Sequence, residues 1–132
     1  MALIKHFREL DVYQNAMNLT MRIFDFTKGW PSEERFNLTE QIRRSSRSVC
    51  ANLVEGWRKR RYRAAFVSKL SDSEAEGAET QVSIELALRC GYREDKTFPQ
   101  IDDAYEKVLG HVVKMVEQPE KWLIKPRGDE HG

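Results

Sequence analysis

The amino-acid sequence predicts an all-α protein that folds as an up-down-up-down, antiparallel four-helix bundle. Apolar residues recur at three- and four-residue spacing in four long stretches, and no stretch between turn signals alternates with the period of a strand. The joints between these stretches are short and contain glycine or proline, which favours antiparallel neighbours. We therefore expect an N-terminal arm at residues 1–9, the bundle at 10–118 and a flexible C-terminal tail at 119–132.

The first two predicted helices each carry an apolar stripe. The first covers residues 10–28 and is ended by the breakers that follow it, and the second covers residues 39–59. Candidate caps for the second helix are Ser32, Asn37 and Thr39. The inner face of the first helix consists of Tyr13, Ala16, Met17, Thr20, Ile23, Phe24 and Thr27. At about 100° per residue, the core stripe of the second consists of Ile42, Ser45, Ser46, Val49, Leu53, Gly56 and Trp57.

The third and fourth predicted helices complete the bundle. The third covers residues 62–90 and stops at Gly91, and the fourth runs from Pro99 to a stop at Pro119. Gly77 within the third helix costs about 1 kcal/mol relative to alanine, so we expect another backbone to approach closely there. The inner stripe of the third helix consists of Tyr62, Phe66, Leu70, Ser73, Gly77, Ile84 and Leu88. That of the fourth consists of Ile101, Tyr105, Val108, Leu109, Val112, Met115 and Val116.

Composition and motifs argue against several classes of function. The 132 residues are 40% hydrophobic, enough for one core, but no apolar run approaches the roughly 20 residues that span a bilayer. The first residues hold no apolar segment of secretory length, so we expect a cytoplasmic protein. Cys50 and Cys90 are expected to be reduced core residues. His6, His111 and His131 have no partner at metal or triad spacing, and glycine-rich phosphate loops are absent. We expect neither enzymatic activity nor a metal or cofactor.

The strongest functional feature is a basic segment in a chain whose net charge is only +1. Its basic side chains are Arg43, Arg44, Arg47, Arg58, Lys59, Arg60, Arg61 and Arg63, against one acid, Glu55. On a helix, most of these arginines lie on the side opposite the core stripe and form a basic stripe on the order of 27 Å long. Arginine suits bidentate phosphate contacts and stacking on unpaired bases. The segment therefore predicts binding of RNA or DNA through phosphate contacts by these eight residues.

Two other interpretations of the basic segment stay open. The arginines could only solubilise the chain, or the protein could be an interaction module whose arginines pair with acids of a neighbouring subunit, such as Asp72, Glu76 and Glu79. A nuclease is a third possibility, although no motif supports it. Within the segment, we expect Glu55 to pair with an arginine or to cap a chain break at Gly56.

Several short motifs along the chain also resemble a known family. They are Phe7-Arg8-Glu9-Leu10-Asp11-Val12-Tyr13-Gln14-Asn15-Ala16, Gln41-Ile42-Arg43-Arg44-Ser45-Ser46-Arg47-Ser48-Val49, Asn52-Leu53-Val54-Glu55-Gly56, Phe66-Val67-Ser68-Lys69-Leu70, Ala78-Glu79-Thr80-Gln81 and Cys90-Gly91-Tyr92. Together, over roughly residues 7–116, they resemble the four-helix bundle family of 23S ribosomal RNA intervening-sequence proteins. That family includes relatives of the accessory variability protein of diversity-generating retroelements.

The resemblance implies an assembly and a role. It implies a homopentameric barrel of four-helix subunits that binds nucleic acid and a reverse transcriptase. This chain would then be an accessory to a reverse transcriptase in a diversity-generating retroelement, or be encoded with a 23S rRNA intervening sequence. Five copies of the basic segment would surround one ring.

Overall fold

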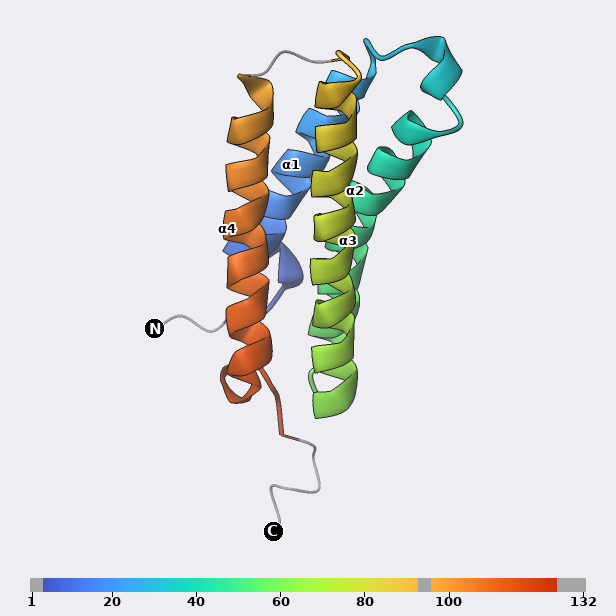
Figure 1. Cartoon of the computed structure of the whole chain (residues 1–132). Helices are drawn as coiled ribbons and strands as arrows, with labels where there is room; N and C mark the ends of the chain where they lie inside the picture. Colours follow the sequence, from blue (N-terminus) through green and yellow to red (C-terminus); the bar gives the residue numbers. More distant parts are fainter. Residues whose placement is uncertain (1–3, 93–95, 126–132) are drawn as a thin grey trace.

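The computed structural model describes residues 4–92 and 96–125, and in this part of the chain all regular structure is helical. The long helices are α1 (Asp11–Thr27), α2 (Leu38–Arg58), α3 (Arg63–Arg89) and α4 (Thr97–Glu117). Short 3-10 helices are η1 (Phe7–Glu9), η2 (Ser32–Glu34) and η3 (Pro119–Lys121). The long helices alternate in direction and each packs against two neighbours, in the order α1, α2, α3, α4 around the bundle (Figure 1). The predicted fold class is confirmed.

The predicted core stripe of α2 is confirmed in full. All seven of its residues are buried, and Ile42 and Val49 are fully inaccessible. On α1 the buried stripe is displaced from the predicted one: Val12 and Leu19 are buried, whereas the predicted inner residues Tyr13, Met17 and Phe24 are only half-buried. Of the three candidate caps, Asn37 directly precedes α2, but its side chain makes no capping bond.

Tyr62 was predicted on the inner stripe of α3, and this prediction is wrong. Its side chain is 66% exposed. The residue lies just before α3 in an extended conformation, with φ −124° and ψ 105°, so helical periodicity does not apply to it. The next residues of the stripe, Phe66 and Leu70, are fully buried.

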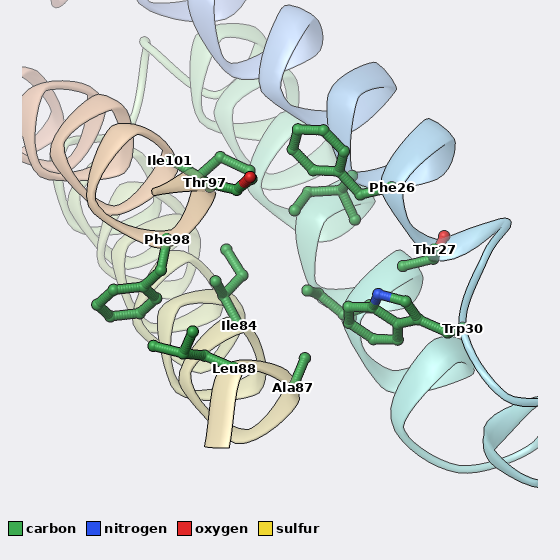
Figure 2. A pocket seen from close by; sticks show the side chains of 11 residues that line it. Phe26, Thr27, Trp30, Ile84, Ala87, Leu88, Thr97, Phe98 and Ile101 are labelled. Carbon is green, nitrogen blue, oxygen red and sulfur yellow. The ribbon is translucent and has the colours of Figure 1, made fainter. Parts of the chain in front are cut away.

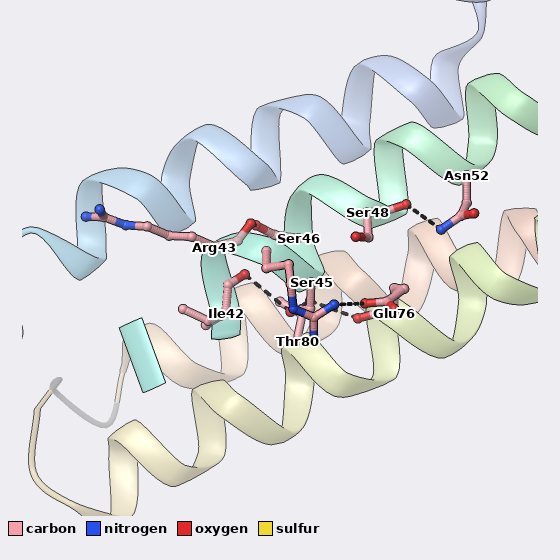
Figure 3. Close-up of polar contacts among 9 residues, drawn as sticks. Ile42, Arg43, Ser45, Ser46, Ser48, Asn52, Glu76 and Thr80 are labelled. Carbon is pink, nitrogen blue, oxygen red and sulfur yellow. Dashed lines mark hydrogen bonds and ion pairs between the residues drawn. The ribbon is translucent and has the colours of Figure 1, made fainter. Parts of the chain in front are cut away.

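Small side chains let α2 and α3 pack closely, and the hydroxyl groups among them are hydrogen-bonded. Ser45 Oγ and Thr80 Oγ1 lie 2.7 Å apart across the two helices (Figure 3). Ser73 Oγ donates to the Val49 carbonyl at 2.8 Å. A buried hydroxyl without a partner would cost about 1–3 kcal/mol, and these bonds to the facing helix add to those that Ser45 and Thr80 make with the Ile42 and Glu76 carbonyls of their own helices. They also fix the register of α2 against α3.

The close approach predicted at Gly77 exists, but it involves a side chain rather than a backbone. Leu109 of α4 occupies the space into which a Cβ atom at Gly77 would project, with its Cγ 3.2 Å from that position and its terminal carbons nearer still. Gly110, on α4, has open space instead. The backbone cost of Gly77 is thus offset by tighter packing of α3 on α4.

Gly91 marks the end of helix α3, as predicted. Gly91 has φ +80°, a left-handed conformation that glycine adopts without strain. Its N–H donates to the Leu88 carbonyl at 3.0 Å, and the Tyr92 N–H donates to the Ala87 carbonyl at 2.9 Å. This pair of bonds satisfies carbonyls that the end of a helix otherwise leaves free.

At the end of the bundle near Gly91, a small apolar cavity lies between the four helices. Its volume is about 20 Å³, which is room for about one water molecule. Figure 2 shows Phe26 and Trp30 on one side of it and Ile84, Phe98 and Ile101 on the other. It is too small for a cofactor.

Several other sequence predictions need correction. Cys50 is buried and free as expected, but Cys90 is free and exposed rather than in the core. Glu55 pairs with a lysine, its Oε2 lying 2.8 Å from Lys69 Nζ, and not with an arginine. Gly56 lies inside an unbroken α2, where Leu70 packs against it. Trp57 is a core residue, as expected.

The first part of the predicted C-terminal tail packs on the bundle. Pro119 is buried, and Trp122 and Leu123 contact the core. The Ile124 N–H donates to the Arg60 carbonyl at 3.1 Å, so the segment reaches the turn between α2 and α3. The rest of the tail, 126–132, lies outside the described residues. None of the helices described is long and apolar enough to cross a membrane.

Candidate nucleic-acid interface

The basic segment is not one continuous helical stripe, because α2 ends at Arg58. From Arg43 to Arg58 the helix rises about 22 Å, and the chain then turns before α3 begins at Arg63. The predicted binding residues therefore fall into two groups. The middle group on α2 consists of Arg43, Arg44 and Arg47. The second group, at the turn between α2 and α3, consists of Arg58, Lys59, Arg60, Arg61 and Arg63.

Two arginines of the middle group are engaged within the subunit. Arg43 is half-buried and points toward α1 (Figure 3), where its Nε donates to Thr27 Oγ1 at 2.7 Å and its guanidinium lies 4.7 Å from the Phe24 ring centroid. Arg44 Nη1 lies 3.7 Å from Glu76 Oε2 on α3. Arg43 thus helps to hold α1 against α2, and the positive charge of Arg44 is partly balanced by Glu76.

Arg47, the third member of the middle group, is exposed, and its side chain has no partner among the described residues. The surroundings of Arg44 are nevertheless acidic. Burial raises the pKa of Glu76, the hydrogen bond with Glu79 and its charge raise it further, and Arg44 acts in the opposite direction. The middle of α2 and the adjacent face of α3 therefore carry little net positive charge.

The turn group has a different electrostatic environment. Arg58, Lys59 and Arg61 are exposed, and in the described part of the chain their side chains have no acidic partner. The backbone of the turn is held on both sides: the Tyr62 N–H donates to the Lys59 carbonyl at 2.9 Å, and the Arg60 carbonyl accepts from Ile124. Exposed cations are thus displayed on a fixed backbone.

Arg60 is half-buried and anchors this turn. Its guanidinium lies 3.3 Å from the Trp57 ring centroid, and its Nε donates to the Trp57 carbonyl at 2.8 Å. Burial lowers the pKa of Arg60, and the charges of Arg58 and Arg61 lower it further. The neighbouring cations therefore repel one another, and a bound anion would relieve that repulsion.

The last member, Arg63, joins the turn to the C-terminal segment. Its Nη1 donates to Glu120 Oε1 at 2.6 Å. The pKa of the Glu120 carboxyl is lowered by its own backbone N–H and then by Arg63. No side chain caps the N-terminus of α3, and its first turn contains no acid. The free N–H groups there add partial positive charge beside Arg63.

Sequence reasoning missed two cations at this end of the bundle. Lys121 follows Glu120, which contacts Arg63, and Lys125 follows Ile124, which contacts the turn; both lysines are exposed. The apolar pair Trp122-Leu123 after Pro119 was the available signal that this segment returns to the core. We call the whole set the basic end: Arg58, Lys59, Arg60, Arg61, Arg63, Lys121 and Lys125.

Other chemistry has less structural support. Within residues 4–92 and 96–125, no group of histidine, cysteine and acidic side chains could hold a metal ion. His6 has a local role, since its Nδ1 accepts from the Arg8 N–H at 3.2 Å. His111 is half-buried on α4, and His131 lies outside the described residues.

Comparison with known proteins identifies the family. Residues 8–114 match the family model of the 23S rRNA-intervening sequence protein. The crystal structure of a protein of unknown function from the S23 ribosomal protein family of Bacteroides thetaiotaomicron has a similar fold. Its TM-score is 0.73 at 25% sequence identity, and the match covers 80% of this chain and 95% of that chain. A comparison with curated proteins gave no match. Because the family model spans most of the sequence, this chain belongs to the 23S rRNA-intervening sequence protein family.

Proposed function

We propose that this protein binds RNA or DNA at the basic end, through phosphate contacts that carry no sequence code. The observation that supports this most is the exposure of Arg58, Lys59 and Arg61 on a hydrogen-bonded turn, with no acidic partner among the described residues. Folding gathers these cations without supplying acids to balance them. Nucleic acid phosphates are the anions that best match such a cluster, because they release condensed counterions when cations bind them.

The contribution of each group of residues follows from its contacts. Arg58, Lys59 and Arg61 make phosphate contacts, since they are exposed and unpaired. Arg60 and Arg63 mainly hold the turn, through Trp57 and Glu120. In the middle group, Arg47 adds a weaker contact along α2.

The proposed role is non-enzymatic and cytoplasmic. Family membership supports a connection with 23S rRNA intervening sequences. On the resemblance to the accessory variability protein, the alternative setting is a diversity-generating retroelement, where the protein would assist a reverse transcriptase. In both settings an RNA or its DNA copy is the available ligand.

The salt dependence of binding tests this function. Titration of a labelled RNA with the protein at several salt concentrations is expected to give an affinity that falls with a log–log slope of about −0.7 to −0.9 per phosphate contacted. The RNA should stay intact during the incubation. Absence of binding even at low salt would refute the proposal, and loss of intact RNA would favour a nuclease instead.

We further propose that the protein is a homo-oligomer that assembles through the outer face of α3. Between residues 64 and 86 this face is exposed, uncharged and largely apolar, and its residues lie within about 40° of one line along the helix. They are Ala64, Ser68, Ser71, Ala75, Ala78, Val82 and Leu86. Val82 is 59% exposed and Leu86 is 47% exposed. A long apolar stripe of this kind is typical of a protein interface. Five subunits is the number that the family resemblance implies.

Replacing Val82 with glutamate is expected to dissociate the oligomer while leaving the subunit folded. A charge buried without a partner in an apolar interface costs several kcal/mol. Sedimentation velocity measures the assembly, and circular dichroism checks the fold. The matched control is Met21→Glu on α1, since Met21 is 52% exposed and lies outside this face.

The same sizing experiment separates the rival interaction module from the nucleic-acid binder. If α2 arginines joined subunits by pairing with α3 acids, high salt would dissociate the assembly as effectively as Val82→Glu. The structure pairs Arg44 with Glu76 of its own chain, which leaves that contact already made within one subunit. An assembly that persists in high salt but not with Val82→Glu supports the α3 face.

A further inference from the structure

An exposed aromatic side chain stands in the middle of the basic end. Tyr62 lies between Arg61 and Arg63 and is 66% exposed. Its side chain has no hydrogen bond, ring contact or cation–π contact within the part of the chain that the structure describes. We propose that Tyr62 is a stacking platform for an unpaired base, so that the preferred ligand is single-stranded nucleic acid. This inference rests on the function proposed above.

The backbone of Tyr62 is held in a fixed position at the surface. The Tyr62 N–H donates to the Lys59 carbonyl, and the Tyr62 carbonyl accepts from the Phe66 N–H at 2.9 Å, the first bond of α3. The extended conformation between these two bonds directs the side chain away from the buried face that Phe66 begins. Because the backbone is already ordered, only the side-chain torsions of Tyr62 lose conformational entropy when a base stacks on its ring.

The two tryptophans at this end, Trp57 and Trp122, pack against the protein, and Trp122 is half-buried against the core. Trp57 is 5% exposed, and the Arg60 guanidinium covers its ring at 3.3 Å. Arg60 therefore stacks on Trp57, which leaves the Tyr62 ring open. The Trp57 indole supports the turn, and the Tyr62 ring is the exposed aromatic face at this end.

The charges around Tyr62 match a single strand. Arg61 and Arg63 flank the ring in the chain, and Arg58 and Lys59 precede it by one turn. Single-strand binding sites combine such cations, which follow the phosphates, with aromatic rings that stack on the bases. A duplex can use the same cations, but its bases are already stacked and paired inside the helix. The contribution of Tyr62 should therefore depend on strandedness, whereas that of the cations should not.

The test compares Tyr62→Ala and Tyr62→Phe on two ligands, an unstructured oligouridylate and a duplex RNA of the same length. Tyr62→Ala is expected to weaken binding of the single strand by about fivefold to about a hundredfold, the range measured for one stacked base. Tyr62→Phe keeps the ring and should retain wild-type affinity. Binding of the duplex should change with neither variant. Phe36→Ala is the control for loss of an exposed aromatic side chain, since Phe36 is 76% exposed and lies before α2, away from the basic end.

The possible outcomes distinguish this inference from the function on which it rests. If wild-type protein binds both ligands and Tyr62→Ala leaves the single strand unaffected, the stacking platform is refuted while nucleic-acid binding stands. An equal loss on both ligands would also refute it, because Tyr62 would then only shape the turn. If the wild type binds neither ligand, the proposed function itself fails. Circular dichroism of each variant confirms that the comparison is made on folded protein.

Discussion

Replacing Arg58, Lys59 and Arg61 together with glutamate is expected to reduce nucleic-acid affinity by a factor on the order of 10³ or more. Three attractive contacts with phosphates become three repulsive ones. The slope of log affinity against log salt concentration should become shallower by about 2 to 3. The fold should be retained, because these three side chains are exposed and have no partner among the described residues. A fluorescence-anisotropy titration at two salt concentrations measures both quantities.

The control for this variant carries the same change in net charge at other sites. Arg22, Arg35 and Lys107 are exposed and lie on α1, after η2 and on α4, away from the turn. Their replacement with glutamate should lower affinity far less. If both triple variants lost affinity equally, overall charge rather than the basic end would control binding.

A second large effect is expected at the contact between α3 and α4. Gly77→Ala should destabilise the protein by about 1–3 kcal/mol, since the new Cβ meets the buried Leu109 side chain. Gly77→Leu should cost more, or prevent folding. Gly110→Ala and Gly110→Leu should each stabilise the protein by up to about 1 kcal/mol. Both residues favour helix more than glycine does, and the space beside Gly110 is open. Urea denaturation monitored by circular dichroism gives each free energy of unfolding.

The double variant Gly77→Ala with Leu109→Ala sharpens this test. Leu109→Ala alone should cost about 2–5 kcal/mol, since it removes a buried side chain. In the double variant the clash is gone and the added methyl group occupies part of the cavity. Its loss of stability should therefore be smaller than the sum of the two single losses. Additive losses would show that Gly77 and Leu109 are not in contact.

Local periodicity was sufficient to predict the helices and the buried side of α2. In α2, Ile42, Val49 and Leu53 repeat with the helical period, so the face they define is independent of how the other helices are arranged. The same reasoning failed one residue before α3. Tyr62 has the angle of Phe66 and Leu70 on a helical projection, but the helix has not yet begun there.

The candidate site was less predictable, because it depends on contacts between segments far apart in the sequence. Whether Arg43 is free or engaged depends on where Thr27 and Phe24 of α1 lie, and nothing within α2 specifies that. Likewise, Lys125 joins the basic end only because the chain after α4 returns to the Arg60 carbonyl. Charge clusters are visible in a sequence, whereas the acids that neutralise them are found only in the folded chain.

The hydroxyl bonds between α2 and α3 also affect how the protein would act as an assembly. The contacts of Ser45 with Thr80 and of Ser73 with the Val49 carbonyl hold the two helices together as one rigid unit. The basic turn forms the tip of this unit. In a closed ring with rotational symmetry, every tip lies on one circle around the axis. A flexible strand that reached from one tip to the next would gain avidity of about 10² to 10⁴ over a single subunit. Weak contacts at each tip would then be enough to hold a long transcript.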